Sequence, residues 1–126
     1  MRPKSLAEVA RLTLGGHSFD LCLGDFLDEF YALPQRGGLE ERPPLLSPAL
    51  GDLGRVQDAY LAAVAEELAT KFHLSLPQWT SSASRALRTP WFASPLASLR
   101  AVLILESPPA FRARNLFVSE NALSRV

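Results

Sequence analysis

Seven residues near the C-terminus combine aromatic rings with planar hydrogen-bonding groups. They are Trp91, Phe92, Phe111, Arg112, Arg114, Asn115 and Phe117. Such side chains are enriched at the centres of protein interfaces, because they bury a large area at a modest cost in side-chain entropy. We therefore predict that they bind a partner. The alternative is that Trp91, Phe111 and Phe117 belong to the core while the arginines pair with the acidic N-terminal half.

Carboxylates form the second group of residues that could do chemistry. Asp25, Asp28 and Glu29 fall within one helical turn, and Asp58 with the pair at 66 and 67 could face them from another helix. Facing carboxylates on helices are how metal-dependent nucleotide hydrolases are built. The paired E-x-x-E and E-x-x-D spacings of those enzymes are missing here. A solvated helix face is therefore the favoured interpretation, with a small metal-dependent hydrolase as an alternative.

The single cysteine and the two histidines give no clear catalytic site. Cys22 lies on an apolar stripe with no base beside it, so we expect it to be buried. His17 and His73 lie near helix ends and far apart in sequence, and His73 is best explained as a helix C-terminal residue that favours the dipole when charged. The sequence predicts no catalytic residue, no metal site and no cofactor.

Length and composition indicate one domain. The chain has 126 residues, 48% of them hydrophobic, with 13 basic and 13 acidic side chains. This length supports a single hydrophobic core, and no apolar stretch or leader segment predicts a membrane span or secretion, so we expect a cytoplasmic protein. The zero net charge divides into −3 for residues 1 to 60 and +3 for the remainder. Such a weak excess gives no support to non-specific nucleic-acid binding.

Apolar spacing and capping residues predict an all-α domain of about five or six helices. Ser5 and Ser18 cap the first two helices, the first of which ends at Gly15-Gly16. Proline and glycine predict a long loop over residues 33 to 54 that packs down on the domain. The strongest helix covers residues 53 to 73.

A polar connection over residues 78 to 89 precedes a nearly all-apolar helix over residues 95 to 106, which we expect to be central. Its stretch 102 to 105 could instead be a buried strand. A short helix should cover residues 110 to 114, and a last helix should begin at Ser119. The predicted core comprises Phe26, Phe30, Tyr60, Val64, Leu68, Leu99, Val102 and Leu103. Leu99→Ala should then cost about 2–5 kcal/mol.

Several stretches together give the chain a family resemblance. It is similar to small bacterial antitoxin-like proteins that we associate with genes for nucleotidyltransferase-like toxins. The resemblance rests on Trp91-Phe92, Glu106-Ser107-Pro108-Pro109-Ala110-Phe111, Arg114-Asn115-Leu116-Phe117-Val118-Ser119-Glu120-Asn121-Ala122-Leu123 and, upstream, Phe26-Leu27-Asp28-Glu29-Phe30-Tyr31.

This resemblance implies a non-enzymatic protein that binds a nucleotidyltransferase-like toxin and blocks its active site, using the loop 33 to 54 and the segment 112 to 121. A regulator that binds the DNA of its own operon is the alternative, since residues 5 to 30 have the outline of a helix-turn-helix. However, the second of those helices carries Asp20, Asp25 and Asp28, which phosphates would repel. Self-association is also left open.

Overall fold

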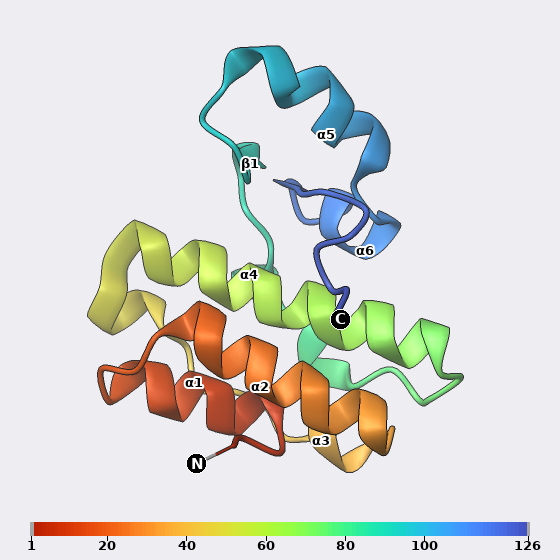
Figure 1. The fold of residues 1–126 in the computed structure, drawn as a ribbon. Helices are drawn as coiled ribbons and strands as arrows, with labels where there is room; N and C mark the ends of the chain where they lie inside the picture. Colours follow the sequence, from red (N-terminus) through yellow and green to blue (C-terminus); the bar gives the residue numbers. More distant parts are fainter. Residues whose placement is uncertain (1, 126) are drawn as a thin grey trace.

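Helices α1 (Leu6–Leu14) and α2 (Phe19–Ala32) begin at the two predicted serine caps. In the computed structural model, which describes residues 2–125, Ser5 Oγ accepts a hydrogen bond from the Glu8 amide at 3.1 Å. Ser18 Oγ accepts one from the Leu21 amide at 3.3 Å. The predicted apolar stripe of α2 is buried, and it comprises Phe19, Cys22, Leu23, Phe26, Leu27 and Phe30. Helices α1 and α2 therefore form an antiparallel pair beneath the longest helix (Figure 1).

The predicted loop over residues 33 to 54 is partly wrong, because two helices occupy much of it. Helix α3 (Gly37–Glu40) is one, and the other is the start of α4 (Ser47–Lys71). Pro48 is compatible with the first turn of α4, where no amide hydrogen is needed. Gly51 then takes φ 64°, and the helix bends there before it continues. The segment does pack down as expected, since Leu39 and Leu46 are fully buried.

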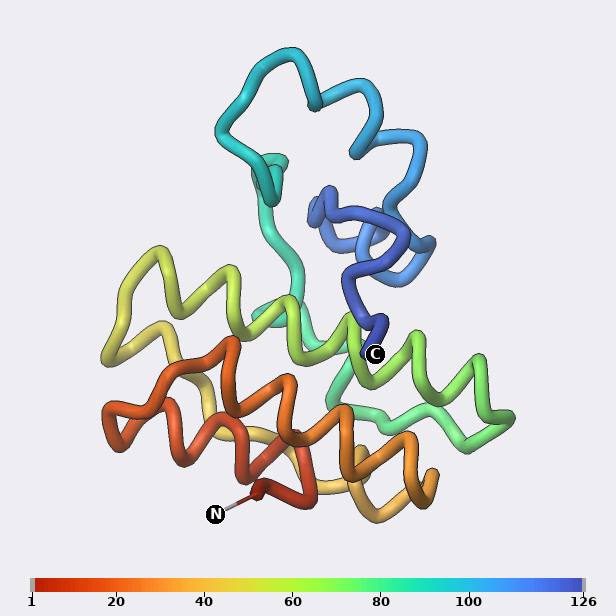
Figure 2. The backbone as a smooth tube through the Cα atoms, viewed as in Figure 1, coloured from red at the N-terminus to blue at the C-terminus, as the bar shows by residue number. Residues whose placement is uncertain are grey.

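Residues beyond α4 rise away from the bundle and return to it (Figure 2). Two 3-10 turns, η1 (Gln78–Ser81) and η2 (Ala83–Arg85), lie against α4. Then follow β1 (Trp91–Phe92), η3 (Ala97–Leu99), α5 (Arg100–Glu106), α6 (Pro109–Arg112) and β2 (Leu116–Phe117). We call residues 86 to 118 the lobe. The predicted helix over residues 110 to 114 is confirmed as α6, whereas the residues after Ser119 form a turn.

Two short parallel strands join the two sides of the lobe. Trp91 is paired with Leu116 and Phe92 with Phe117. The Trp91 amide donates to the Asn115 carbonyl at 2.8 Å, and the Ala93 amide donates to the Phe117 carbonyl at 3.0 Å. The stretch 102 to 105, an alternative strand, is helical. With six α-helices among residues 2–125, the fold is all-helical as predicted.

The predicted core is correct for the bundle and wrong for most of α5. Phe26, Phe30, Val64, Leu68 and Leu103 are buried, and Tyr60 is half-buried. In contrast, Leu99 and Val102 keep 39% and 44% of their surface exposed. The helix predicted over residues 95 to 106 is not central. It is split into η3 and α5, and it stands at the outer end of the lobe (Figure 1).

Exposure reverses the expected effect of substitution at residue 99. Leu99→Ala should lower the free energy of unfolding by less than about 1 kcal/mol, because the side chain already contacts water. Leu103→Ala, in the next turn, removes a side chain that is only 8% exposed and should cost about 2–5 kcal/mol. Urea denaturation followed by circular dichroism measures both. Equal losses would place Leu99 in the core after all.

Candidate protein-interaction surface

Exposed apolar side chains are concentrated on the outer end of the lobe. Five of the eleven exposed large apolar residues of the described chain lie between residues 96 and 105, and they are Leu96, Leu99, Val102, Ile104 and Leu105. We call these five residues the lobe surface. Leu105 is 80% exposed and Leu96 59%, whereas Leu103 alone in α5 is buried. An exposed apolar group of this kind is typical of an interaction site.

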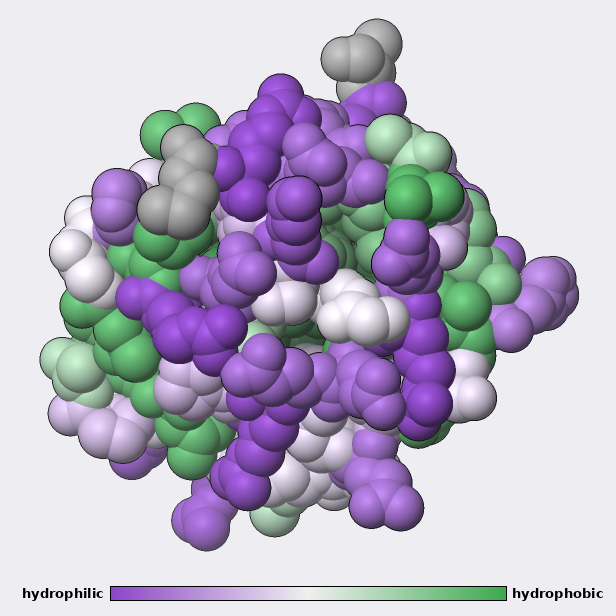
Figure 3. All heavy atoms as spheres, turned by 90° about the horizontal axis from the view of Figure 1, so that it is seen from below, coloured by the Kyte–Doolittle hydropathy of each residue, from purple (hydrophilic) through white to green (hydrophobic). Residues whose placement is uncertain are grey.

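The opposite face of the molecule differs in character. It is formed by α1, α2 and α3, and Figure 3 shows hydrophilic residues running across its middle while the hydrophobic ones lie in separate patches. On α2, Asp20 and Leu21 are exposed, and Asp28 pairs with Arg125 at 2.9 Å. Glu29, Glu40 and Glu41 on this face also pair with arginines, so its charge is mixed and only the exposed carboxylates of α2 would repel DNA phosphates.

The lobe surface has a basic edge. Within the lobe there are four basic residues and one acidic residue, Glu106, which follows Leu105. The Arg100 guanidinium lies 5.1 Å from the centre of the Phe92 ring, and Phe92 stacks on Phe117 at 5.1 Å. No ion pair involves Arg100 within residues 2–125. Its planar group is therefore held over an aromatic face while its charge remains available to a partner.

The seven residues predicted to bind a partner mostly build the lobe and its connection to the bundle. Phe111 is fully buried and packs edge-on against Tyr60 at 4.9 Å. Arg114 is 8% exposed and pairs with Glu66 at 2.8 Å. Its guanidinium also donates to the carbonyls of Ala110 and Thr80, at 2.8 and 3.0 Å. These two side chains point into the protein rather than towards a partner.

Asn115 and the three remaining aromatic residues hold the base of the lobe. Asn115 has φ 62°, a left-handed conformation that asparagine tolerates, and its Nδ2 donates to the Leu87 carbonyl at 2.8 Å. Trp91, Phe92 and Phe117 are half-buried. Arg112 is the one residue of the seven whose side chain is exposed. The structure thus brings six of the predicted residues together beneath the lobe surface instead of in it.

The carboxylates considered for metal chemistry are dispersed. Within residues 2–125 no three Cys, His, Asp or Glu side chains gather where they could hold a metal ion. Asp58 is 1% exposed and faces the fully buried Arg85, with 3.8 Å between Oδ1 and Nη1. Its carboxylate also accepts hydrogen bonds from the amides of Leu46 and Ser47. Asp58 thus fixes the start of α4.

Cys22 and the two histidines lie in surroundings that do not favour catalysis. Burial raises the pKa of the Cys22 thiol, and the nearby Asp25 carboxylate raises it further. A thiol with a raised pKa is a poor nucleophile at neutral pH. His17 and His73 are both exposed, and His73 adopts φ 56° after the end of α4.

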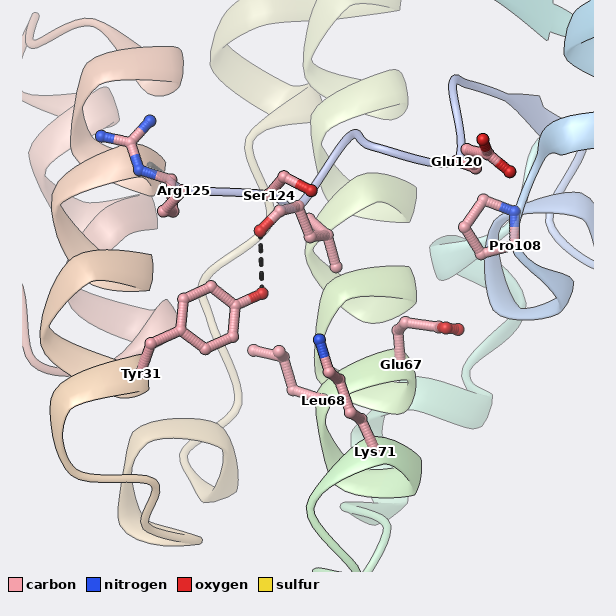
Figure 4. A pocket seen from close by; sticks show the side chains of 9 residues that line it. Tyr31, Glu67, Leu68, Lys71, Pro108, Glu120, Ser124 and Arg125 are labelled. Carbon is pink, nitrogen blue, oxygen red and sulfur yellow. Dashed lines mark hydrogen bonds between the residues drawn. The ribbon is translucent and has the colours of Figure 1, made fainter.

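A cavity of about 470 Å³ lies between α2, α4 and the last described residues (Figure 4). Tyr31 Oη donates to the Leu123 carbonyl at 2.8 Å across it. Burial raises the pKa of Tyr31, and the Glu67 carboxylate adds to the effect. The Lys71 ammonium lies 5.6 Å from the centre of the Tyr31 ring. The lining of the cavity includes both acidic and basic side chains, and in Figure 4 these charged groups do not point towards a common position where a ligand could bind.

Sequence reasoning missed the lobe surface because an apolar helix is usually a buried one. The signal that could have revealed it was the flanking sequence. Ser94, Pro95 and Arg100 interrupt the pattern, and the regular part is only seven residues long.

Among the helices of residues 2–125, none has the length and apolar character needed to cross a membrane.

The fold and this surface define an all-helical domain that carries an exposed apolar lobe. Comparison with protein-family models, curated proteins and solved structures found no match for the chain.

Proposed function

We propose that this chain is a non-enzymatic interaction protein that binds another protein through its lobe surface. The observation that carries the proposal is the exposure of Leu96, Leu99, Val102, Ile104 and Leu105 on one projecting element. Short apolar helices bind partners by placing their exposed side chains in a hydrophobic groove. Here Leu103 fixes α5 to the lobe, so that the remaining apolar side chains stay presented to a partner.

Charge decides which kind of partner fits. The lobe holds four arginines, at residues 88, 100, 112 and 114, against a single carboxylate, that of Glu106 at the end of α5. An apolar groove bordered by Asp or Glu side chains is complementary to this arrangement, whereas a basic groove would be repelled. The partner in this proposal is therefore a protein with an acidic border around an apolar groove.

The family resemblance makes the partner more specific. Similarity to antitoxin-like proteins implies that the partner is a nucleotidyltransferase-like toxin, and that binding blocks its active site. A projecting lobe suits that mechanism, because a narrow element can enter a cleft that a flat surface would only cover. In this proposal the lobe surface takes the contact role that the sequence assigned to residues 33 to 54 and 112 to 121.

The test uses a photo-crosslinking amino acid at residue 102, with the nucleotidyltransferase-like product of the neighbouring gene co-expressed. We expect a covalent adduct to that enzyme, with the crosslinked peptide rich in apolar and acidic residues. A crosslinker at residue 21, which is 73% exposed on the acidic α2 face, is the matched control and should give no adduct.

A charged double variant measures the energetic contribution of the surface. Val102→Asp with Leu105→Asp should weaken binding by about a hundredfold or more, because both carboxylates would be buried unpaired against an acidic border. The melting temperature should stay the same, since both positions are exposed. Undiminished binding would refute the proposed surface. The pure chain could instead associate with itself through this surface, and the variant would then abolish that association. That result would identify the partner as a second copy of the chain rather than the enzyme.

A further inference from the structure

A groove of about 750 Å³ lies between the first half of α4 and the connection that leads into β1. Figure 2 shows this connection, residues 86 to 90 at the start of the lobe, rising past α4 as an extended segment. The volume falls within the range of roughly 300–1,000 Å³ that is typical of small-molecule sites. The groove is separate from the lobe surface, because none of the five lobe-surface residues lines it.

Two arginines face the groove from opposite walls. Arg55 comes from α4 and Arg88 from the connection. Arg55 has only a weak partner, since Asp52 lies 3.7 Å away with its side chain fully exposed to solvent. Arg88 has no ion pair or hydrogen bond within residues 2–125. Asp52 lines the groove as well, so an anion must displace its carboxylate from Arg55, whereas the Arg88 guanidinium is free to bind one.

The wall that carries Arg88 is rigid. The Leu87 amide donates to the Arg114 carbonyl at 3.1 Å, and the Leu87 carbonyl accepts from Asn115 Nδ2 at 2.8 Å. Three residues beyond Arg88, the Trp91 amide is tied to Asn115 at 2.8 Å. Residue 88 thus lies between two anchored residues, so less conformational freedom is lost when a ligand binds.

Hydroxyl groups and one aromatic ring complete the lining. Ser47, Ser84 and Thr89 contribute hydroxyl groups, which suit the several acceptor oxygens of a phosphate. Trp91 lines the same groove and is half-buried, so part of its indole remains exposed there. An exposed indole offers a stacking surface to any planar base. A simple anion would leave this ring unused, whereas a ligand with both a phosphate and a base would contact the arginines, the hydroxyl groups and the indole together.

We propose that the groove binds a nucleotide, with the phosphate between Arg55 and Arg88 and the base against Trp91. The shared chemistry is a phosphate joined to a planar base, which can come from a free mononucleotide or from a single-stranded nucleic acid. This site is independent of the proposed protein partner.

Tryptophan fluorescence of the full chain tests the proposal, with AMP as the probe. Of the two tryptophans, Trp79 is buried and donates its Nε1 hydrogen to the Leu39 carbonyl, so a change on titration reports Trp91. We expect saturable quenching by AMP, and binding at least about tenfold weaker for adenosine or inorganic phosphate alone. A short oligothymidylate binding more tightly than AMP would support a strand as the source, and the reverse order a free nucleotide.

Variants separate this site from nonspecific charge. Arg88→Ala should weaken AMP binding by at least about tenfold, because one charge-assisted contact to the phosphate is lost. Arg112→Ala removes another exposed arginine outside the groove and should leave the affinity unchanged. Val102→Asp with Leu105→Asp should also leave it unchanged.

Three results would overturn the proposal. The first is no saturable binding of AMP or the oligonucleotide, the second is equal affinity for AMP and inorganic phosphate, and the third is equal loss in Arg88→Ala and Arg112→Ala. A glutamate-rich peptide that saturates the groove when nucleotides do not would assign it to an acidic protein segment instead.

Discussion

Replacing Arg85 with alanine should lower the free energy of unfolding by about 3–5 kcal/mol, because it leaves a buried carboxylate without its cation. Arg85 and Asp58 are 0% and 1% exposed. The Arg85 guanidinium donates to the Pro43 and Asp58 backbone carbonyls and lies 5.0 Å from the centre of the Trp79 ring. Burial lowers the pKa of Arg85, whereas the Asp58 carboxylate raises it. The pair links the segment before α4, α4 itself and the η1–η2 connection.

Arg88→Ala is the matched control for this experiment. It removes the same side chain three residues later, where it is exposed, and should change stability by no more than about 0.5 kcal/mol. Urea denaturation followed by circular dichroism gives both values. A loss below about 1 kcal/mol in Arg85→Ala would show that the Asp58 carboxylate is not dependent on this cation.

Gly54→Ala should destabilise the protein by about 2 kcal/mol or more, although alanine is the better helix former by about 1 kcal/mol. A Cβ at residue 54 would lie 2.6 Å from the carbonyl carbon and oxygen of Leu46 and 2.7 Å from Ser47 Cα. These are backbone atoms that cannot rotate away. Moving them would also disturb the amide hydrogen bonds of Leu46 and Ser47 to Asp58.

A second glycine provides the comparison. A Cβ at Gly37, in α3, would have no atom within 4 Å, and Gly37 does not have a positive φ. Gly37→Ala should therefore leave stability unchanged or raise it by up to about 1 kcal/mol. Thermal unfolding of the two variants shows the sign directly. A neutral Gly54→Ala would mean that the Leu46–Ser47 backbone can move aside at little cost.

Most of the bundle could be predicted from local sequence signals. Ser5 and Ser18 cap helices by contacts within four residues, and the stripe from Phe19 to Phe30 has the helical period. Such signals are local, so they need no knowledge of the tertiary structure. The start of α4 was harder to predict, because the conformation at Gly51 and the contacts of Asp58 with residues 46 and 47 depend on a close approach of two segments.

The error over residues 95 to 106 has a different cause. An apolar sequence indicates that a segment is more stable away from water. It does not indicate whether the segment is buried in the core of its own chain or left exposed on the surface. Of this segment only Leu103 is buried, because the small interior of the lobe is already occupied by Phe111, Leu116 and Val118. The strands β1 and β2 were also unpredicted, since each has only two residues. Six of the seven residues predicted to bind a partner therefore support the lobe, whereas two of the eight predicted core residues, Leu99 and Val102, lie on the lobe surface.

The segregation of charge has a consequence for the speed of association. Helix α2 carries four acidic residues and no basic one and lies on the side of α4 opposite the lobe (Figure 1), while the lobe holds four arginines and one glutamate. The molecule therefore has an electric dipole despite its zero net charge. In the field of an acidic partner this dipole turns the lobe forward before contact, which raises the fraction of productive collisions. Added salt should slow the encounter and leave the lifetime of the complex almost unchanged.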